Sequence, residues 1–347
     1  MPPPTPTLPW TTTPLLINAP MANFAGGALA SAVSLAGGLG MIGCLTSTSD
    51  LRRELDTAAT ALSSHTFFQE THSLPIGVGF LTFLLKLDDI LPLVREYRPA
   101  VIWLFAAPHV DEYAAWSAAL RTASPGSSVW IQTGSVDAAL QICRTAAPDV
   151  LCMQGADAGG HGFEKGAGVI SLVPETADAL AREGFAHVPL VAAGGIVDGR
   201  GVAAALALGA AGVVMGTRFL ASREVVVHAR YQAAVLEARD GGQVTTRSRI
   251  FDELRGPNVW PEAYDGRSLV VRSYRDHVGG VGVEEIRRLY GEAVEEEDRG
   301  WKTGLQGRAA IWAGTGVGLV REVLGAGEIV ERVRGEARDT LGRLARL

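Results

Sequence analysis

The chain has 347 residues, of which 47% are hydrophobic and 20% charged, and its formal net charge is −6 at pH 7. This balance excludes a disordered chain, and an acidic net charge without a basic block argues against nucleic acid as the main partner. Three cysteines without CxxC spacing indicate neither a disulfide framework nor a zinc site, and favour a reducing compartment such as the cytoplasm.

Short runs of Val, Ile and Leu alternate with segments of helical periodicity along the first two thirds of the chain. Such continuous runs are typical of parallel strands that are buried on both faces. The predicted strands are Leu15–Ala19, Leu39–Gly43, Ile76–Phe80, Val101–Phe105, Val129–Gln132, Val150–Gln154, Leu190–Ala193 and Gly212–Met215. Helical spacing is clearest in Leu87–Tyr97, Val136–Thr145, Glu175–Glu183 and Arg200–Leu208. Eight β–α units favour a closed (β/α)₈ TIM barrel over residues 14–222, with a doubly wound sheet as the alternative.

The uncharged stretch from Phe24 to Leu45 is long enough to cross a membrane. Half of it is Gly or Ala, so we interpret it as a helix of small residues followed by a buried strand, and we expect no membrane span. Within it, Gly38–Gly43 matches the GxGxxG dinucleotide fingerprint. That motif binds a dinucleotide only between a strand and a helix, whereas here it follows the helix-like run and itself predicts a strand.

The pattern changes after Arg218. The segments that follow are a helix-like stretch (Glu224–Arg239), a polar and irregular region (Gly241–Val281), an acidic helix (Glu284–Asp298) and a terminal helix (Glu328–Arg346). We expect residues 223–347 to form the last barrel helix and a C-terminal helical cap region that packs over the barrel mouth. Trp312 and the turn Gly314–Gly318 have apolar neighbours and little charge nearby, which suits such packing.

Two glycine turns at the ends of the last two predicted strands are the clearest functional signal. They are Ala193-Gly194-Gly195 and Gly216-Thr217. The loops after the seventh and eighth strands of a TIM barrel often bind phosphate. Glycines let backbone N–H groups approach phosphate oxygens, and the Thr217 hydroxyl can add a donor. A pair of tight turns is the alternative, but two glycine turns at neighbouring strand ends favour a phosphate site.

A histidine follows the sixth predicted strand, in the sequence Gly159-Gly160-His161-Gly162. We expect a glycine-flanked loop on the active face of the barrel, where the imidazole can act as a general base near neutral pH. A surface histidine without function is the alternative, and the neighbouring phosphate site favours the catalytic role. His109, after the fourth strand, is a weaker second candidate. No HxH or HxxxH pair indicates a metal site.

These segments resemble the nitronate monooxygenases, flavin enzymes formerly called 2-nitropropane dioxygenases. The matching segments are Ile17–Ala22, Gln154–Gly162, Ala192–Arg200 and Met215–Phe219, and Gly314–Gly318 resembles a glycine turn of the family near the C-terminus. Strand-end order and spacing agree over residues 14–222. The resemblance implies an FMN-binding barrel that oxidises alkyl nitronates or nitroalkanes with O₂ to carbonyl compounds and nitrite.

The resemblance also implies roles for individual residues. Ala19, Pro20 and Met21 would lie against the isoalloxazine ring. Gly194, Gly195, Gly216 and Thr217 would hold the FMN phosphate, and Gly79, Gln132, Gln154, Gly160 and Ala193 would complete the flavin contacts. His161 would take the proton from the carbon beside a nitro group, or position the nitronate.

The sequence departs from the family pattern at two of these positions. Many bacterial members carry Asn where this chain has Gly79, and Lys where it has Gln132. Gln132 can still donate a hydrogen bond to the flavin, but it lacks the positive charge that would stabilise an anionic reduced flavin.

Two other activities remain open from the sequence. One is an NAD(P)H-dependent FMN reductase on the same barrel, acting on quinones or an enoyl thioester, and the other is a flavin-free phosphosugar isomerase or synthase. The expected partners are a small nitronate or nitroalkane and O₂, and the oligomeric state is not predicted. The terminal Ala345-Arg346-Leu347 is similar to an SKL-type address, so we expect a cytoplasmic protein or, in a eukaryote, a peroxisomal one.

Overall fold

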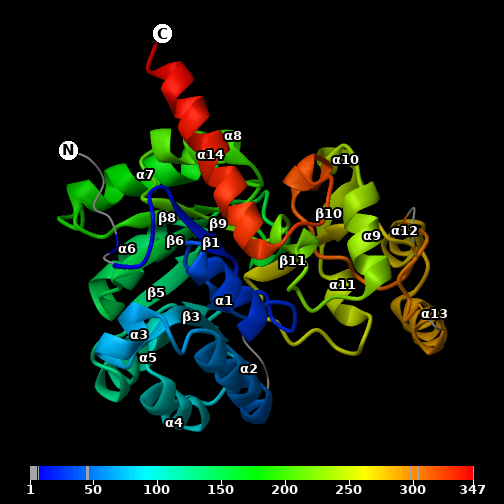
Figure 1. Cartoon of the computed structure of the whole chain (residues 1–347). Coiled ribbons are helices and arrows are strands. Elements are labelled where there is room, and N and C mark those ends of the chain that lie inside the picture. Colours follow the sequence, from blue (N-terminus) through cyan, green and yellow to red (C-terminus); the bar gives the residue numbers. More distant parts are fainter. Residues whose placement is uncertain (1–5, 7, 44–46, 297, 303–304, 347) are drawn as a thin grey trace.

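The computed structural model describes residues 6, 8–43, 47–296, 298–302 and 305–346. Eight parallel strands form its centre, with helices around them and a smaller lobe at one side (Figure 1). The strands are β1 (Leu15–Asn18), β2 (Met41–Ile42), β3 (Leu74–Leu81), β4 (Pro99–Phe105), β5 (Ser128–Thr133), β6 (Val150–Gln154), β8 (Leu190–Ala193) and β9 (Gly212–Met215). They pair in the order β1-β9-β8-β6-β5-β4-β3-β2, and a parallel bridge from Ile17 to Leu39 closes the ring. The predicted TIM barrel is confirmed.

Alternate residues of each barrel strand point into and out of the ring. In β4, Val101, Trp103 and Phe105 belong to the inner hydrophobic cluster, whereas Ile102 and Leu104 pack outward against the helices. Burial on both faces explains why the strands are continuous apolar runs in the sequence.

The outer helices are α1 (Gly27–Leu35), α2 (Thr48–Ala61), α3 (Thr66–Thr71), α4 (Leu87–Tyr97), α5 (Glu112–Ala123), α6 (Val136–Ala146), α7 (Val169–Arg182), α8 (Gly199–Ala207) and α14 (Ala326–Leu344). The last of these, α14, comes from the end of the chain and lies between α8 and α1. It is held there by Arg334, which donates hydrogen bonds to the carbonyls of Ala36 and Gly37 at 2.9 and 2.7 Å. The predicted helix and strand within Phe24–Leu45 are confirmed as α1 and β2. Of the helices in the described residues, none is long and apolar enough to span a membrane.

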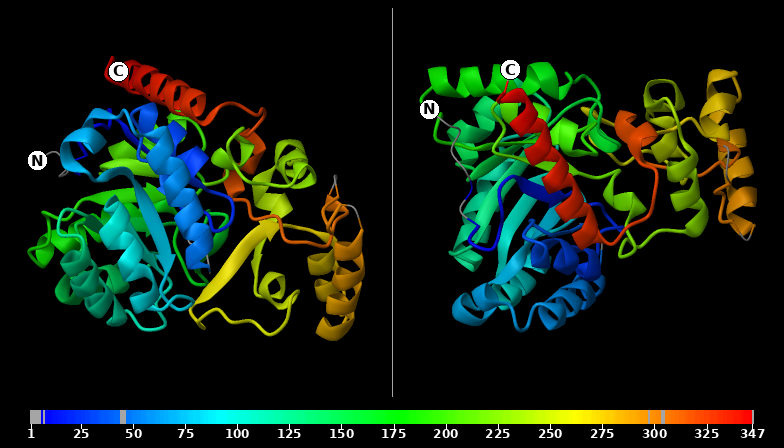
Figure 2. Two further views of the ribbon diagram at one scale, coloured as in Figure 1. Left: turned by 60° about the horizontal axis from the view of Figure 1, so that its bottom comes forward. Right: turned by 45° about the horizontal axis from the view of Figure 1, so that its top comes forward.

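The lobe contains a small antiparallel sheet, ordered β10-β11-β7, that is not predicted from the sequence. Its elements are η1 (Phe219–Ala221), α9 (Ala229–Glu237), α10 (Gly241–Val244), β10 (Thr245–Ser248), α11 (Ile250–Glu253), β11 (Tyr264–Leu269), α12 (Arg272–Val278), α13 (Val283–Glu295), η3 (Thr315–Leu319) and, from the barrel, β7 (Gly160–Phe163). In Figure 2, α12 and α13 lie farthest from the barrel.

Two predictions are therefore wrong. Gly241–Val281 is not irregular, and His161 lies in strand β7 rather than in a loop. The reason is that β7 pairs with β11, about a hundred residues later in the chain, with Phe163 opposite Tyr264 and His161 opposite Gly266. A four-residue strand rich in glycine carries no period of its own, and its partner is too distant in sequence to be recognised.

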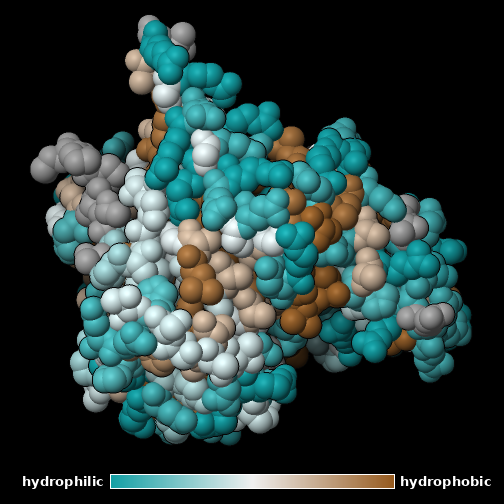
Figure 3. All heavy atoms as spheres, viewed as in Figure 1, coloured by the Kyte–Doolittle hydropathy of each residue, from teal (hydrophilic) through white to brown (hydrophobic). Residues whose placement is uncertain are grey.

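The lobe contacts the barrel at the C-terminal ends of its strands. Gly314 N–H donates to the Thr217 hydroxyl at 3.0 Å, and Thr315 N–H donates to the Asp157 carbonyl at 3.0 Å. Both barrel residues follow strand ends. In the space-filling view, apolar residues gather along the junction between barrel and lobe, while polar residues cover most of the remaining face (Figure 3).

Two of the three cysteines lie in the described residues, and both are buried free thiols. Burial raises the pKa of Cys143 to about 12 and raises the pKa of Cys152 well above its ordinary value. Neither provides a thiolate near neutral pH. The third, Cys44, lies outside the described residues, as does Leu347 of the terminal tripeptide.

Candidate active site

The turn Ala19-Pro20-Met21 crosses the end of the barrel between β9 and β3. Ala19 N–H donates to the Met215 carbonyl at 2.9 Å, which extends the pairing of β1 with β9. On the other side Pro20 fills the space in front of Gly79, where an added Cβ would lie 2.5 Å from the Pro20 Cβ. Gly79 therefore has a packing reason to be glycine, because any side chain there would displace the turn.

The two glycine turns after β8 and β9 present unpaired backbone donors. Gly194 and Gly195 have φ angles of +113° and +74°, a backbone conformation that favours glycine. Within the described part of the chain, the N–H groups of Gly194, Gly195, Gly216 and Thr217 donate to no protein acceptor. Backbone N–H groups that are left free in this way can bind an anion.

A third glycine turn, from the lobe, packs against the first two. The Thr315 hydroxyl donates to Asp157 Oδ1 at 3.0 Å, and a Cβ at Gly314 would lie only 2.5 Å from the Asp157 carbonyl oxygen. Because the Thr217 hydroxyl oxygen accepts from Gly314 N–H, its own O–H proton is directed elsewhere and can be donated to a ligand. The Gly314–Gly318 turn thus lies beside the two turns after β8 and β9. We call these three turns, together with Ala19-Pro20-Met21, the rim of the site.

Two glutamines and one glycine continue the rim toward β5 and β6. Gln132 Oε1 accepts a hydrogen bond from the buried Trp103 indole at 3.0 Å. Gln154 Nε2 donates to the His161 carbonyl at 2.9 Å, while its Oε1 is buried with no partner among the described residues. The space in front of Gly160, where φ is +71°, holds no protein atom within 4 Å of an added Cβ.

His161 is enclosed by side chains of the lobe. Its Nε2 lies 2.6 Å from Asp252 Oδ1, and the two side chains are only 14% and 7% exposed. The Trp260 ring stacks on the imidazole with centroids 3.6 Å apart and planes 7° apart, and the Trp312 ring lies at 4.7 Å and 51°. Gly266 lies beside them, because an added Cβ there would come within 2.4 Å of the Trp312 ring. We call His161, Asp252, Trp260, Gly266 and Trp312 the histidine box.

Trp312 was singled out from the sequence, but Asp252, Trp260 and Gly266 were not. They lie in the segment that was predicted to be irregular, and no spacing relates them to His161. Tertiary pairing of β7 with β11 brings them together. His109, the second candidate, is exposed in the turn after β4 and is not part of the box.

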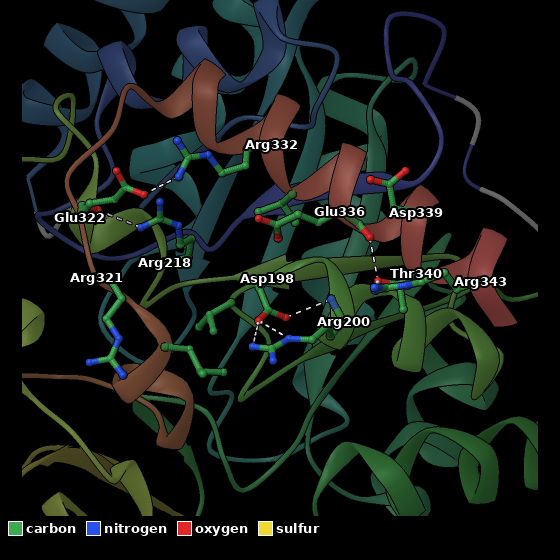
Figure 4. A pocket seen from close by; sticks show the side chains of 13 residues that line it. Asp198, Arg200, Arg218, Arg321, Glu322, Arg332, Glu336, Asp339, Thr340 and Arg343 are labelled. Atoms are coloured by element: carbon green, nitrogen blue, oxygen red, sulfur yellow. Dashed lines mark hydrogen bonds and ion pairs between the residues drawn. The ribbon is translucent and has the colours of Figure 1, made fainter.

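A separate cleft of about 410 Å³ lies between α14 and the loops after β8 and β9 (Figure 4). None of the residues predicted for the site lines it. Its charged side chains largely pair with one another, as Arg200 does with Asp198 at 2.9 Å and Arg332 does with Glu322. Arg218 donates to the Glu322 carbonyl at 3.1 Å, and burial lowers the pKa of its guanidinium.

Comparison with known proteins relates this arrangement to one family. The family model for nitronate monooxygenases matches residues 90–335. This chain belongs to the nitronate monooxygenase family. It is 47% identical over 339 residues to a nitronate monooxygenase of Metarhizium robertsii, covering 96% of this chain and 94% of that protein. Identity to a nitronate monooxygenase of Neurospora crassa is 37%, covering 97% and 92% of the two chains. The resemblance seen in the sequence is thus confirmed, and the protein is an oxidoreductase.

Solved structures agree on the architecture. FabK from Thermotoga maritima superposes with a TM-score of 0.71 at 26% identity, covering 95% of this chain and 94% of that one. A nitroalkane oxidase from Streptomyces ansochromogenes superposes with a TM-score of 0.73, covering 95% and 98% of the two chains, and at 24% identity it supports the fold alone.

Proposed function

We propose that this protein binds one FMN non-covalently and uses it to oxidise alkyl nitronates, and nitroalkanes after deprotonation, with O₂ to carbonyl compounds and nitrite. The observation that carries the proposal is that a rim with free backbone N–H groups and a partly enclosed histidine lie at the C-terminal end of one TIM barrel. Membership of the nitronate monooxygenase family supports the same substrate class.

The rim fits the phosphate of FMN. The free N–H groups of Gly194, Gly195, Gly216 and Thr217 follow the ends of two neighbouring strands, β8 and β9. At Gly216 neither backbone strain nor packing requires a glycine. Its φ is not in the left-handed region. An added Cβ would meet Ala19 and Met21 at ordinary distances of 3.6 and 3.7 Å. We infer that the missing side chain leaves room for a ligand.

The rest of the rim fits the flavin ring. The turn Ala19-Pro20-Met21 offers a mostly apolar surface. The buried Oε1 of Gln154 has no partner among the residues that the structure describes, so it can accept a hydrogen bond from a ring N–H. The amide of Gln132 can donate to the ring or the ribityl chain, since its oxygen is already used by Trp103. When bound, FMN supplies electron transfer from the nitronate to O₂.

The protein supplies proton transfer and shields the reaction from water. His161 takes the proton from the carbon beside the nitro group, and the electrons of that C–H bond remain on the resulting nitronate. Trp260 contacts Phe83, Phe105 and Tyr264 as well as the imidazole. These rings form an apolar cover over the barrel end, which strengthens electrostatic interactions beneath it.

A visible spectrum tests the proposal. The purified protein should be yellow and release FMN on denaturation. Anaerobic addition of propionate 3-nitronate should bleach the flavin bands, and readmission of O₂ should restore them and release nitrite. A colourless protein that takes up no FMN would contradict the proposal. Bleaching by NADH alone, with no response to the nitronate, would instead indicate an FMN reductase.

A further inference from the structure

The contact between His161 and Asp252 joins the barrel to a short helix of the lobe. Asp252 lies in α11, 91 residues after His161, and its Oδ1 is 2.6 Å from His161 Nε2. Its Oδ2 is buried and has no partner among the described residues. The carboxylate is therefore committed to a single partner, the imidazole.

This contact determines which ring nitrogen can accept a proton. An ionised carboxylate only accepts hydrogen bonds, so the neutral imidazole carries its proton on Nε2 and keeps a lone pair on Nδ1. In the described part of the chain, no hydrogen bond to Nδ1 is found. Nδ1 is thus the nitrogen that remains available to a substrate.

The aromatic neighbours prevent the ring from leaving this orientation. Trp260 lies parallel to the imidazole at 3.6 Å, so rotation about the Cβ–Cγ bond would drive the ring into the indole. On another side the Trp312 ring lies at 4.7 Å, and Gly266 leaves the space that the Trp312 indole and the imidazole need. A base held in one orientation loses little entropy on reaching the transition state.

We propose that Asp252 is the positioning residue for His161: it holds the proton on Nε2, presents Nδ1 to the substrate, and neutralises the imidazolium that forms. This inference rests on the proposed function, in which His161 is the base. When the substrate C–H bond breaks, its electrons stay on the nitronate and its proton bonds to Nδ1. The imidazolium then carries the transferred proton on Nδ1 and keeps its original proton on Nε2, which points at the Asp252 carboxylate.

The first test compares two substrates in the holoenzyme. Asp252→Asn removes the charge and lets the side chain donate as well as accept, so both tautomers of His161 become possible. We expect kcat/KM for neutral nitroethane to fall by about tenfold or more, as when a group that orients a metal-bound histidine is lost. Preformed ethyl nitronate needs no deprotonation, so its turnover and the FMN content should change little.

The matched control is Glu253→Gln, the next acid of α11, whose side chain makes no ion pair among the described residues. It should leave both substrates unaffected. Equal losses on nitroethane and nitronate in Asp252→Asn, or no loss on either, would overturn the inference. If His161→Asn itself keeps full turnover of nitroethane, the proposed function fails instead.

The second test does not depend on activity. In holoenzyme labelled with ¹⁵N-histidine, at a pH where the ring is neutral, the signals that disappear in His161→Asn belong to His161. We expect Nε2 to have the chemical shift of a protonated nitrogen and Nδ1 that of an unprotonated one. In Asp252→Asn the two shifts should move toward each other as the tautomers mix. A proton on Nδ1 in the wild-type protein would overturn the assignment.

Discussion

The candidate site has two sides that are built in different ways: the side that we propose for the phosphate, called the phosphate side, and the histidine side. On the phosphate side, Gly194, Gly195 and Gly216 contribute backbone N–H groups at the ends of two adjacent strands, β8 and β9. On the histidine side, His161 depends on Asp252 and on two tryptophans that reach it from other parts of the chain.

The difference predicts which changes should impair each side of the candidate site. A backbone site depends on the barrel's own geometry and on the absence of side chains, so a single added side chain should block it. A side-chain site depends on the lobe being folded against the barrel, so it should respond to changes far away in the sequence.

Removal of residues 223–347 should destroy both halves. The truncated chain loses the lobe and also α14, which places Ile329, Val330 and Val333 in the hydrophobic core beside α1 and α8. We expect an insoluble or flavin-free product, measured as soluble yield and flavin absorbance. A chain that ends after Leu344 keeps α14 complete and serves as the control. A soluble, yellow and active fragment of 222 residues would refute the dependence of the barrel on its C-terminal segment.

Gly216→Val should abolish flavin retention while the protein stays folded. The added Cβ meets its protein neighbours at ordinary distances, and we expect the side chain to fill the space that we propose for the phosphate. The flavin-to-protein ratio after gel filtration and the circular dichroism spectrum measure the two effects. Gly195→Val should also lose flavin, with additional strain, because φ at Gly195 is +74°.

The control for these variants is Gly291→Ala in α13, where an added Cβ meets nothing within 4 Å. It should keep its flavin. Full flavin content in both Gly216→Val and Gly195→Val would show that the phosphate is held elsewhere, and the contrast between the two halves would no longer hold.

His161→Asn should leave the phosphate side intact and affect only proton transfer. Loss of a positioned base typically lowers turnover by about 10²–10⁴-fold, and we expect such a loss for neutral nitroalkanes with normal FMN content. Preformed nitronate should lose much less activity. Steady-state nitrite release with the two substrates measures the split, and equal losses would mean that His161 binds the anion rather than removing a proton.

Much of the barrel could be predicted from the sequence because its determinants are local. Burial on both faces makes each strand a continuous apolar run, and β6, β8 and β9 have the bounds that the sequence predicted. The glycine turns are equally local, since each lies directly after its strand. Gln132 and Gln154 lie at strand ends, and the family resemblance singled them out there, but their partners, Trp103 and the His161 carbonyl, could not be foreseen.

The sequence by itself thus determined the eight-stranded barrel and the rim of backbone donors, because periodicity and strand ends are properties of neighbouring residues. Only the tertiary structure decided that α14 fills the gap between α8 and α1, and that His161 lies in a strand facing Asp252 and Trp260. Those arrangements depend on contacts between residues about 90 to 300 positions apart. Such contacts are selected by packing and burial in the folded chain and leave no period in the sequence.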